Sequence, residues 1–458
     1  MKISFLSLLL FFTISINAQQ CWKMVSLGAD FCVALKQDGT LWAWGHNESG
    51  QLGVGSFEDM LLPTKVGMES DWESISAGYG FVVALKTNGT IWVWGRNDFG
   101  LGREPNSIIN TPAQVGTDSD WKYVHAGGAH SFAIKNDGTL WAWGRNDFGQ
   151  LGIGLFNHSN VPVQVGNDSD WKAVAAGNLH SLGVKTDNSL WSWGYNFAGQ
   201  LGLGTAGFGT EANIPTQIKT IPANQWKCVA AGGRHSLAVS EDGKLWVWGN
   251  NNFFALGLND GSEYKSLPTL IDNTSNWKMV AGGINNTLAV KEDNTIWGWG
   301  ENVDGQLGDG SNINRASPVQ INIDAEWLFV DSGLQHSMFL NEVGILTTGR
   351  NNYGELGIGS LVEYNTPQSV ICPINLGVAE HPELSFIAYP NPVAEVLFLR
   401  NINNIKIDEI QILNSTGRVV LKEKNEYSAI RVDQLQSGLY LLQILSEKHW
   451  YQIKFIKE

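Results

Sequence analysis

The motif Trp-x-Trp-Gly-x-Asn occurs six times in this chain, about once every 50 residues, and a degenerate seventh copy follows at residues 346–351. The six copies begin at Trp42, Trp92, Trp141, Trp191, Trp246 and Trp297. A second tryptophan series precedes them, at Trp22, Trp72, Trp121, Trp171, Trp226, Trp277 and Trp327. Self-similarity at a fixed period of this length indicates one supersecondary unit stacked seven times.

The third repeat shows what one unit is expected to fold into. Residues 121–127, 130–135 and 140–144 alternate apolar and polar side chains and predict three strands. Asp137-Gly138 suits the positive φ angles of a tight hairpin turn. Residues 162–165 predict a short fourth strand, where Pro162 suits a strand start or a sheet edge. Four antiparallel strands in each of seven units predict an all-β fold, a seven-bladed β-propeller.

The N-terminal residues 1–18 have the features of a signal peptide. Lys2 precedes an apolar run over residues 3–16, which is too short for a comfortable membrane span, and Ala18 precedes an expected cleavage point. Cys21 suggests a lipoprotein as the alternative, but residues 18–20 match poorly the small residues that precede a lipidated cysteine. We expect export, with a mature chain that begins near Gln19.

The two ends of the repeat region suggest how a ring closes. The fourth strand of the last repeat has no successor, and the first Trp strand has no predecessor. By repeat register, Cys372 corresponds to Met68 and Cys21 to Asp71, three positions apart across one turn. A Cys21–Cys372 disulfide is therefore expected, and an exported protein permits it; the alternative is two free thiols. Cys32 and Cys228 are expected to be small buried residues.

The repeats resemble the regulator of chromosome condensation repeat family. The resemblance rests on Val-Ala-Ala-Gly at 174–177, His180 with Ser181, Trp-Ala-Trp-Gly at 141–144 and Gly-Gln-Leu-Gly-Ile-Gly at 149–154. It covers roughly residues 21–372 and implies a seven-bladed propeller over residues 19–372. It leaves the function open, because function depends on sites placed on a fold.

The family's eukaryotic namesake binds chromatin and activates a small GTPase through a protruding insertion in one blade. No comparable insertion is present here, since the longest repeat, around residues 204–225, exceeds the others by about five residues. The formal net charge of −14 disfavours polyanions such as nucleic acid. We therefore expect neither a nucleic acid nor a small GTPase as partner. The family also includes secreted bacterial inhibitors of β-lactamases, which suggests a binding role.

A second domain is expected after Cys372. Residues 373–384 read as a linker, and residues 385–458 contain alternating segments at 396–399, 410–413, 418–421 and 439–444, with a hairpin turn at 414–417. These short strands predict a small Ig-like β-sandwich.

This segment is similar to the C-terminal sorting domain of the type IX secretion system of Bacteroidetes. The matching residues are Tyr-Pro-Asn-Pro at 389–392, Asn414 with Gly417, Leu435 with Gly-Leu-Tyr at 438–440, and Lys-Phe-Ile-Lys at 454–457. The resemblance implies contact with the secretion machinery and passage through the outer membrane, usually with removal of this domain. The alternative is an ordinary accessory domain that stays attached.

Residues that suggest chemistry recur with the repeat, which favours a structural role. His130, His180, His235 and His336 each precede a serine, and we expect them to be buried and satisfied by backbone hydrogen bonds. The asparagines after Trp-Gly are expected to hold their loops. Asp260 and Asp309 lie in Asp-Gly-Ser turns that lack calcium-loop spacing, so at most weak calcium binding is expected. The sequence predicts no catalytic residue, no cofactor and no structural metal.

The informative positions are those that vary at a fixed place in the repeat. Two such positions flank each loop asparagine and are expected to form rings on one face, where aromatic and arginine residues suit protein binding. The candidates are His46, Arg96, Phe99, Arg145, Phe148, Tyr195, Phe253, Glu301, Arg350 and Tyr353. The alternative is that the phenylalanines pack under their own loops.

Together these features predict a secreted or cell-surface propeller that binds an extracellular protein or glycan without catalysis and is exported by type IX secretion. The alternative is a proteinaceous inhibitor of an extracellular or periplasmic enzyme. A polysaccharide-active enzyme is a weaker alternative, because no cluster of acids and bases breaks the repeat.

Overall fold

The computed structural model of the protein describes residues 21–98, 101–103, 109–219, 226–272, 274, 276–323, 327–342, 344–373, 386–389, 393–401, 406–414, 418–423, 429–446 and 449–457. The chain divides into two compact units between Cys372 and Pro373. The expected signal peptide and most of the expected linker lie outside the described residues.

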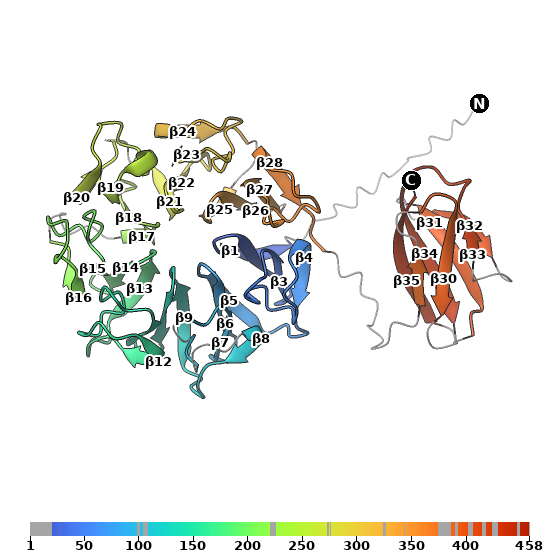
Figure 1. The fold of residues 1–458 in the computed structure, drawn as a ribbon, viewed down its shortest axis with the longest axis horizontal. Coiled ribbons are helices and arrows are strands. Elements are labelled where there is room, and N and C mark those ends of the chain that lie inside the picture. Colours follow the sequence, from blue (N-terminus) through green and yellow to red (C-terminus); the bar gives the residue numbers. More distant parts are fainter. Residues whose placement is uncertain are drawn as a thin grey trace, which may run out of the picture. The chain divides into compact units, whose positions relative to one another are not determined.

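The first unit consists, over its described residues, of seven four-stranded antiparallel sheets arranged in a ring (Figure 1). Each sheet contains four consecutive strands in sequential order, so each blade is one repeat, and blades 1 to 7 are numbered along the chain. The expected all-β propeller is confirmed.

The strands occupy equivalent places in every blade. The innermost strands are β1 (Trp22–Leu27), β5 (Trp72–Ala77), β9 (Trp121–Ala126), β13 (Trp171–Ala176), β17 (Trp226–Ala231), β21 (Trp277–Gly282) and β25 (Trp327–Ser332). The second strands are β2 (Phe31–Lys36), β6 (Phe81–Lys86), β10 (His130–Lys135), β14 (His180–Lys185), β18 (His235–Ser240), β22 (Asn286–Lys291) and β26 (His336–Asn341). The third strands are β3 (Leu41–Gly45), β7 (Ile91–Gly95), β11 (Leu140–Gly144), β15 (Leu190–Gly194), β19 (Leu245–Asn250), β23 (Ile296–Gly300) and β27 (Ile345–Gly349). The outermost strands are β4 (Met60–Val66), β8 (Ile109–Gln114), β12 (Ser159–Gln164), β16 (Ala212–Gln217), β20 (Tyr264–Leu270), β24 (Arg315–Ile321) and β28 (Tyr364–Val370). A short 3₁₀ turn, η1 (Asn252–Phe254), precedes β20.

A side-chain relay fixes the hairpin between the second and third strands. In blade 3, Asp137 accepts hydrogen bonds from the Thr139 amide (2.9 Å) and hydroxyl (2.7 Å), and the Thr139 hydroxyl accepts one from Trp141 Nε1 (3.0 Å). Gly138 adopts φ +85° there, as a tight turn requires. The relay recurs in blades 1, 2, 4 and 6.

Neighbouring blades are joined by a buried hydrogen-bond unit. The Gln150 carbonyl of blade 3 accepts hydrogen bonds from Trp193 Nε1 and Ser181 Oγ of blade 4, each at 2.9 Å. The Ser181 hydroxyl in turn lies 3.1 Å from His130 Nε2 of blade 3. Because the Ser181 hydrogen is directed to the carbonyl, His130 Nε2 must carry the proton that it donates.

The histidines of this unit are buried, as expected, but their Nε2 atoms bond to side chains and not to the backbone. His130, His180 and His235 contact Ser181, Ser236 and Thr287 of the following blade. Burial lowers the pKa of His130 and His180 to about 3 and that of His235 to about 4, so these side chains are neutral. Each partner is more than 50 residues away in the chain, which is why one repeat read alone does not reveal it.

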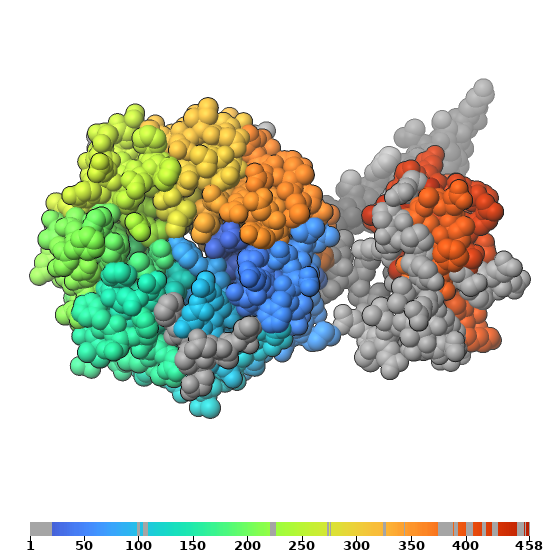
Figure 2. Space-filling model, viewed as in Figure 1, coloured from blue at the N-terminus to red at the C-terminus, as the bar shows by residue number. Residues whose placement is uncertain are grey.

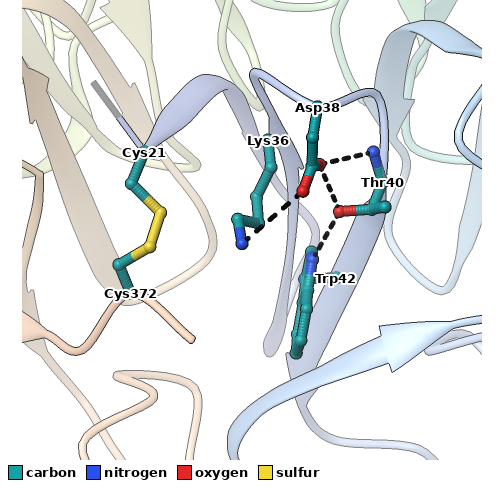
Figure 3. The surroundings of a disulfide bond; sticks show 6 residues. All are labelled: Cys21, Lys36, Asp38, Thr40, Trp42 and Cys372. Atoms are coloured by element: carbon teal, nitrogen blue, oxygen red, sulfur yellow. Dashed lines mark hydrogen bonds and ion pairs between the residues drawn. A yellow bond between two sulfur atoms is a disulfide. The ribbon is translucent and has the colours of Figure 1, made fainter. Parts of the chain in front are cut away.

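Blade 7 packs against blade 1 and closes the ring (Figure 2, orange against blue). The Glu355 carbonyl of blade 7 accepts Trp44 Nε1 of blade 1 at 3.1 Å, and the Asp331 carboxyl accepts the Leu27 amide at 2.9 Å. Cys21 and Cys372, the pair expected from the register, form a disulfide with a Cα–Cα distance of 6.3 Å (Figure 3). The ring thus closes by contacts between complete blades and a covalent clasp, rather than by a shared sheet.

The second unit contains two antiparallel sheets over its described residues. One consists of β29 (Phe386–Tyr389), β30 (Val396–Asn401) and β33 (Ala429–Arg431). The other has the order β32 (Val419–Glu423), β31 (Glu409–Asn414), β34 (Gly438–Ser446), β35 (His449–Lys457). Leu397 of the first sheet and Ile410, Leu442 and Phe455 of the second share one buried core. Residues 390–392 of the expected Tyr-Pro-Asn-Pro motif, and 415–417 of the expected turn, lie outside the described part of the chain.

Candidate binding face

Two kinds of connection lie on the same face of the propeller, because the first and third strands of a blade run in the same direction. These are the turns between the first and second strands and the loops between the third and fourth strands. The Arg96 amide, at the start of such a loop, donates to the Gly80 carbonyl of such a turn at 2.8 Å, and Arg145 pairs likewise with Ala129. We call this surface the loop face, and the opposite surface, which carries the Asp-Gly hairpins, the hairpin face.

The long loops of the loop face are held from inside by their asparagines, as expected. Asn146 Oδ1 accepts the Leu151 amide at 2.9 Å, while its Nδ2 donates to the carbonyls of Leu155 (2.8 Å) and Asn157 (3.0 Å). The first of these bonds recurs in all seven blades. A rigid loop base presents the side chains around it in fixed positions.

The two variable positions meet across blade boundaries. Phe148 of blade 3 lies against Tyr195 of blade 4 with ring centroids 4.7 Å apart, and Tyr353 of blade 7 lies against His46 of blade 1 at 4.2 Å. The Arg350 guanidinium is 5.8 Å from the Tyr353 ring centre. Phe148 therefore packs on the neighbouring blade rather than only under its own loop.

The remaining candidates divide by exposure. Arg96 is exposed, and Phe253 is 45% exposed with φ +55°. Glu301 is 9% exposed and accepts a hydrogen bond from Asn285 Nδ2 at 2.9 Å, so the structure places it in a contact within the fold. Phe99 lies outside the described residues.

An exposed aromatic cluster covers blades 3 and 4 of the loop face. It consists of Phe148, Tyr195, Phe197 and Phe208, with ring centroids 6.3 Å apart for Tyr195–Phe197 and 4.8 Å for Phe197–Phe208. Phe197 is 42% and Phe208 84% exposed. Our sequence reasoning missed these two because they lie outside the fixed positions, although Phe208 belongs to the longest repeat.

A hollow of about 260 Å³ opens beside this cluster, between blades 2 and 3. Arg96 and Arg145 line it from adjacent blades, together with Tyr79 and Asn178. Arg96 Nε donates to Asp98, and Arg145 Nε to Asp147, so an acidic residue of the same loop positions each guanidinium. The structure thus brings together two residues that the sequence identified only by repeat position.

The central channel, about 320 Å³ in volume, is lined mainly by glycine, alanine and serine of the innermost strands. Burial raises the pKa of Asp331 in its wall to about 6. Cys32 is buried, as expected, but Cys228 is half-buried, because its side of the innermost strand borders this channel. The expectation that Cys228 is buried is therefore wrong.

In the two turns considered for calcium, the aspartate carboxylate forms an ion pair with an arginine or lysine side chain. Asp309 lies 2.6 Å from the Arg315 guanidinium, and Asp260 lies 2.6 Å from Lys265 Nζ. Within the described ranges, no group of three or more His, Cys, Asp or Glu residues could hold a metal ion. No helix in that part of the chain has the length and apolar character needed to cross a membrane.

Family comparisons agree with this architecture. Residues 12–288 match the family described as RCC1-like domain, and residues 278–306 and 293–340 match regulator of chromosome condensation (RCC1) repeats. Residues 387–458 match the secretion system C-terminal sorting domain.

Curated relatives match over part of their length only. The ultraviolet-B receptor UVR8 of Arabidopsis thaliana is 33% identical over 169 residues, which is 36% of this chain and 38% of the receptor. The human E3 ubiquitin-protein ligase HERC2 is 31% identical over 163 residues, 34% of this chain and 3% of the ligase. The chain therefore spans less than half the length of these relatives.

Solved structures share the fold. Yeast RCC1 (Prp20), solved bound to Kap60, aligns with a TM-score of 0.62 and 25% identity, over 68% of this chain and 78% of its own. Human WBSCR16 aligns with a TM-score of 0.64 and 22% identity, over 70% and 86%. A second structure of Prp20p, from Saccharomyces cerevisiae, is described together with its binding to Gsp1p and histones.

Proposed function

The chain belongs to the family of RCC1-like domains and contains a secretion-system sorting domain, and we propose that it is a secreted or cell-surface propeller that binds an extracellular protein through its loop face without catalysis. The sorting domain would engage the type IX secretion machinery. A secreted or cell-surface chain is not expected to meet partners such as Gsp1p and histones, with which yeast Prp20p is described, so neither a small GTPase nor a nucleic acid is proposed.

The observation that carries this proposal is the aromatic cluster beside the arginine-lined hollow. Phe197 and Phe208 remain exposed although each contacts another ring. Aromatic and arginine side chains are enriched among the residues that supply most of the binding free energy at protein interfaces, and aromatic rings bury a large area with few rotamers to fix. Rigid loop bases lower the entropic cost of binding further.

The alternative is that the partner is an enzyme and that the propeller inhibits it. The same loop face would serve, and stoichiometric loss of the partner's activity would identify this case. A polysaccharide-active enzyme has less support, because the carboxylates of Asp98, Asp147, Asp260 and Asp309 are each paired with an arginine or lysine. Turnover on a panel of polysaccharides would contradict the proposal of no catalysis.

Photo-crosslinking tests the binding face directly. p-Benzoylphenylalanine is placed at Phe197 or Phe208, and the protein is irradiated on the native cells and in their culture medium. The expected result is a discrete protein adduct from both positions. The matched control is Asn136, which is exposed in the blade 3 hairpin of the opposite face and should give no adduct.

Two results would contradict the proposal. One is equal crosslinking from Asn136 and from the two phenylalanines, which would mean nonspecific contact. The other is absence of any protein adduct from Phe197 and Phe208 while a polysaccharide adduct forms, which would identify a glycan as the partner.

A further inference from the structure

We propose that the hollow between blades 2 and 3 receives a carboxylate side chain of the partner protein, while the aromatic cluster beside it receives an apolar side chain of the same partner. This inference rests on the proposed function and names the chemistry of the partner.

The loop of blade 2 is one residue shorter than its counterparts. Residues 97–102 read Asn-Asp-Phe-Gly-Leu-Gly, whereas residues 146–152 of blade 3 read Asn-Asp-Phe-Gly-Gln-Leu-Gly. The missing position is that of Gln150, which is fully buried and whose carbonyl accepts two hydrogen bonds from blade 4. At the shortened boundary, the buried Trp143 Nε1 has no hydrogen-bond partner among the described residues. Ser131, whose counterpart Ser181 donates to the Gln150 carbonyl, lines the hollow, so the hollow borders the position that the missing glutamine would occupy.

The groups that line the hollow favour an anion. They include two guanidinium groups, Arg96 and Arg145, against one carboxylate, Asp98. His130 also lines it but is neutral, because burial lowers its pKa to about 3. Asp147, which pairs with Arg145, does not line the hollow, so the lining itself carries two guanidinium groups against one carboxylate and would orient an acidic partner group.

Arg96 is held in a position that suits this role. Its stem lies over Gly80, where a Cβ would come within 3.3 Å of Arg96 Cβ, and its Nε donates to Asp98. The Arg96 side chain is 65% exposed, and its terminal nitrogens have no hydrogen-bond partner among the described residues. A fixed guanidinium with such nitrogens matches the two oxygens of a carboxylate.

Neutral donors complete the hollow. Burial raises the pKa of the Tyr79 phenol, so its hydroxyl keeps its hydrogen, and the Asn178 amide lines the same space. Phe148 follows Arg145 by three residues in the same loop, and its ring contacts Tyr195 of the aromatic cluster. A single segment of the partner could therefore place an acidic side chain in the hollow and an apolar side chain against the aromatic cluster.

A peptide library tests this chemistry without knowledge of the natural partner. Random 12-residue peptides displayed on yeast are sorted against the purified protein, and the selected peptides are then measured against Arg96→Gln/Arg145→Gln. We expect the selected peptides to carry Asp or Glu near Phe, Leu, Ile or Val. We expect the double variant to bind them at least tenfold more weakly. Arg96→Lys/Arg145→Lys, which keeps the charge but loses the planar fork, should fall between the two.

The charge-matched control is Lys122→Gln/Lys172→Gln. Both lysines are exposed at the starts of the innermost strands β9 and β13, and neither lines the hollow, so this variant should retain binding. Selected peptides without acidic residues would overturn the inference. Equal affinity of the peptides for Arg96→Gln/Arg145→Gln and for the charge-matched control would overturn it as well. If binding is lost in Phe197→Ala/Phe208→Ala but unchanged in Arg96→Gln/Arg145→Gln, this inference fails while loop-face binding stands. Absence of loop-face crosslinks would instead remove the proposed function itself.

Discussion

His336 of the last blade directs its Nε2 at Cys32 Sγ of the first blade, 3.3 Å away. The Cys32 thiol in turn lies 3.2 Å from the Glu355 carbonyl, as Ser181 and its counterparts lie against the preceding loop. The closing boundary of the ring therefore repeats the hydrogen-bond unit of the inner boundaries, with sulfur in place of oxygen.

Substitutions at Cys32 should separate this contact from simple packing. Cys32→Ser restores the side chain of the other blades and should leave stability unchanged within about 1 kcal/mol. Cys32→Ala leaves the buried His336 Nε2–H without an acceptor and should lower the free energy of unfolding by about 1–3 kcal/mol. Urea unfolding followed by tryptophan fluorescence measures both. Equal stability of the two variants would show that the thiol serves only as packing.

Removal of the disulfide should weaken the whole propeller. The bond joins residues 351 positions apart, so it restricts the unfolded chain strongly. Cys21→Ser/Cys372→Ser should lower stability by about 2–5 kcal/mol. Thermal unfolding with and without dithiothreitol provides the check, because reductant should destabilise the natural protein and leave the double variant unaffected. An equal response of both proteins would mean that reductant acts elsewhere.

Acidification should destabilise the propeller through its neutral histidines. Burial lowers the pKa of His235 to about 4, whereas an unfolded histidine titrates near 6.5. Between these values the unfolded chain binds a proton that the folded chain does not, so the free energy of unfolding falls as pH falls from about 6.5 to 4. Asp331 acts in the opposite direction, because burial raises its pKa to about 6 and the folded state binds the extra proton.

His235→Asn should therefore flatten the pH profile of stability by up to about 1.4 kcal/mol per pH unit in this window. Asparagine suits the position, since Asn286 of blade 6 donates to Ser332 of blade 7 at 2.9 Å. Asp331→Asn should make the decline steeper. Denaturant titrations at pH 4 to 7 measure both slopes, and an unchanged slope in His235→Asn would contradict the assignment of a neutral histidine.

Two tryptophans test the shortened loop. Trp143 and Trp193 are both fully buried at equivalent positions, but among the residues that the structure describes only Trp193 Nε1 has a partner, the Gln150 carbonyl at 2.9 Å. Trp193→Phe should therefore cost about 1–2 kcal/mol more than Trp143→Phe. The difference between their urea midpoints is the measurement, and a larger loss in Trp143→Phe would contradict the comparison.

Strands and turns followed from the repeat because they depend on neighbouring residues. The expected segments 130–135 and 140–144 match β10 and β11, since alternation and an Asp-Gly turn specify a hairpin locally. The outer strand begins earlier than expected, at Ser159, and contains Pro162. An edge strand tolerates a residue without an N–H group there, so the proline did not mark the start.

Partners across blade boundaries did not follow from the repeat. The contact of Phe148 with Tyr195 depends on how two loops meet in space, and one repeat carries no record of that. Glu301 occupied a candidate position but lies buried against Asn285. Strands β33 and β35 of the second unit were also missed, because β33 has only three residues and β35 was noted only as a family motif.

The Glu355 carbonyl, which accepts hydrogen bonds from two residues of blade 1, has a consequence for the order in which the propeller folds during synthesis. Blade 1 is synthesised first, yet the buried Trp44 Nε1 and the Cys32 thiol bond to Glu355, which is made more than three hundred residues later. The buried hydrogen-bond donors of the first blade thus obtain their partners only after the last blade has been synthesised. Glu355 and Cys372 both precede the sorting domain in the sequence. A nascent chain that already contains the sorting domain therefore also contains the residues that complete blade 1.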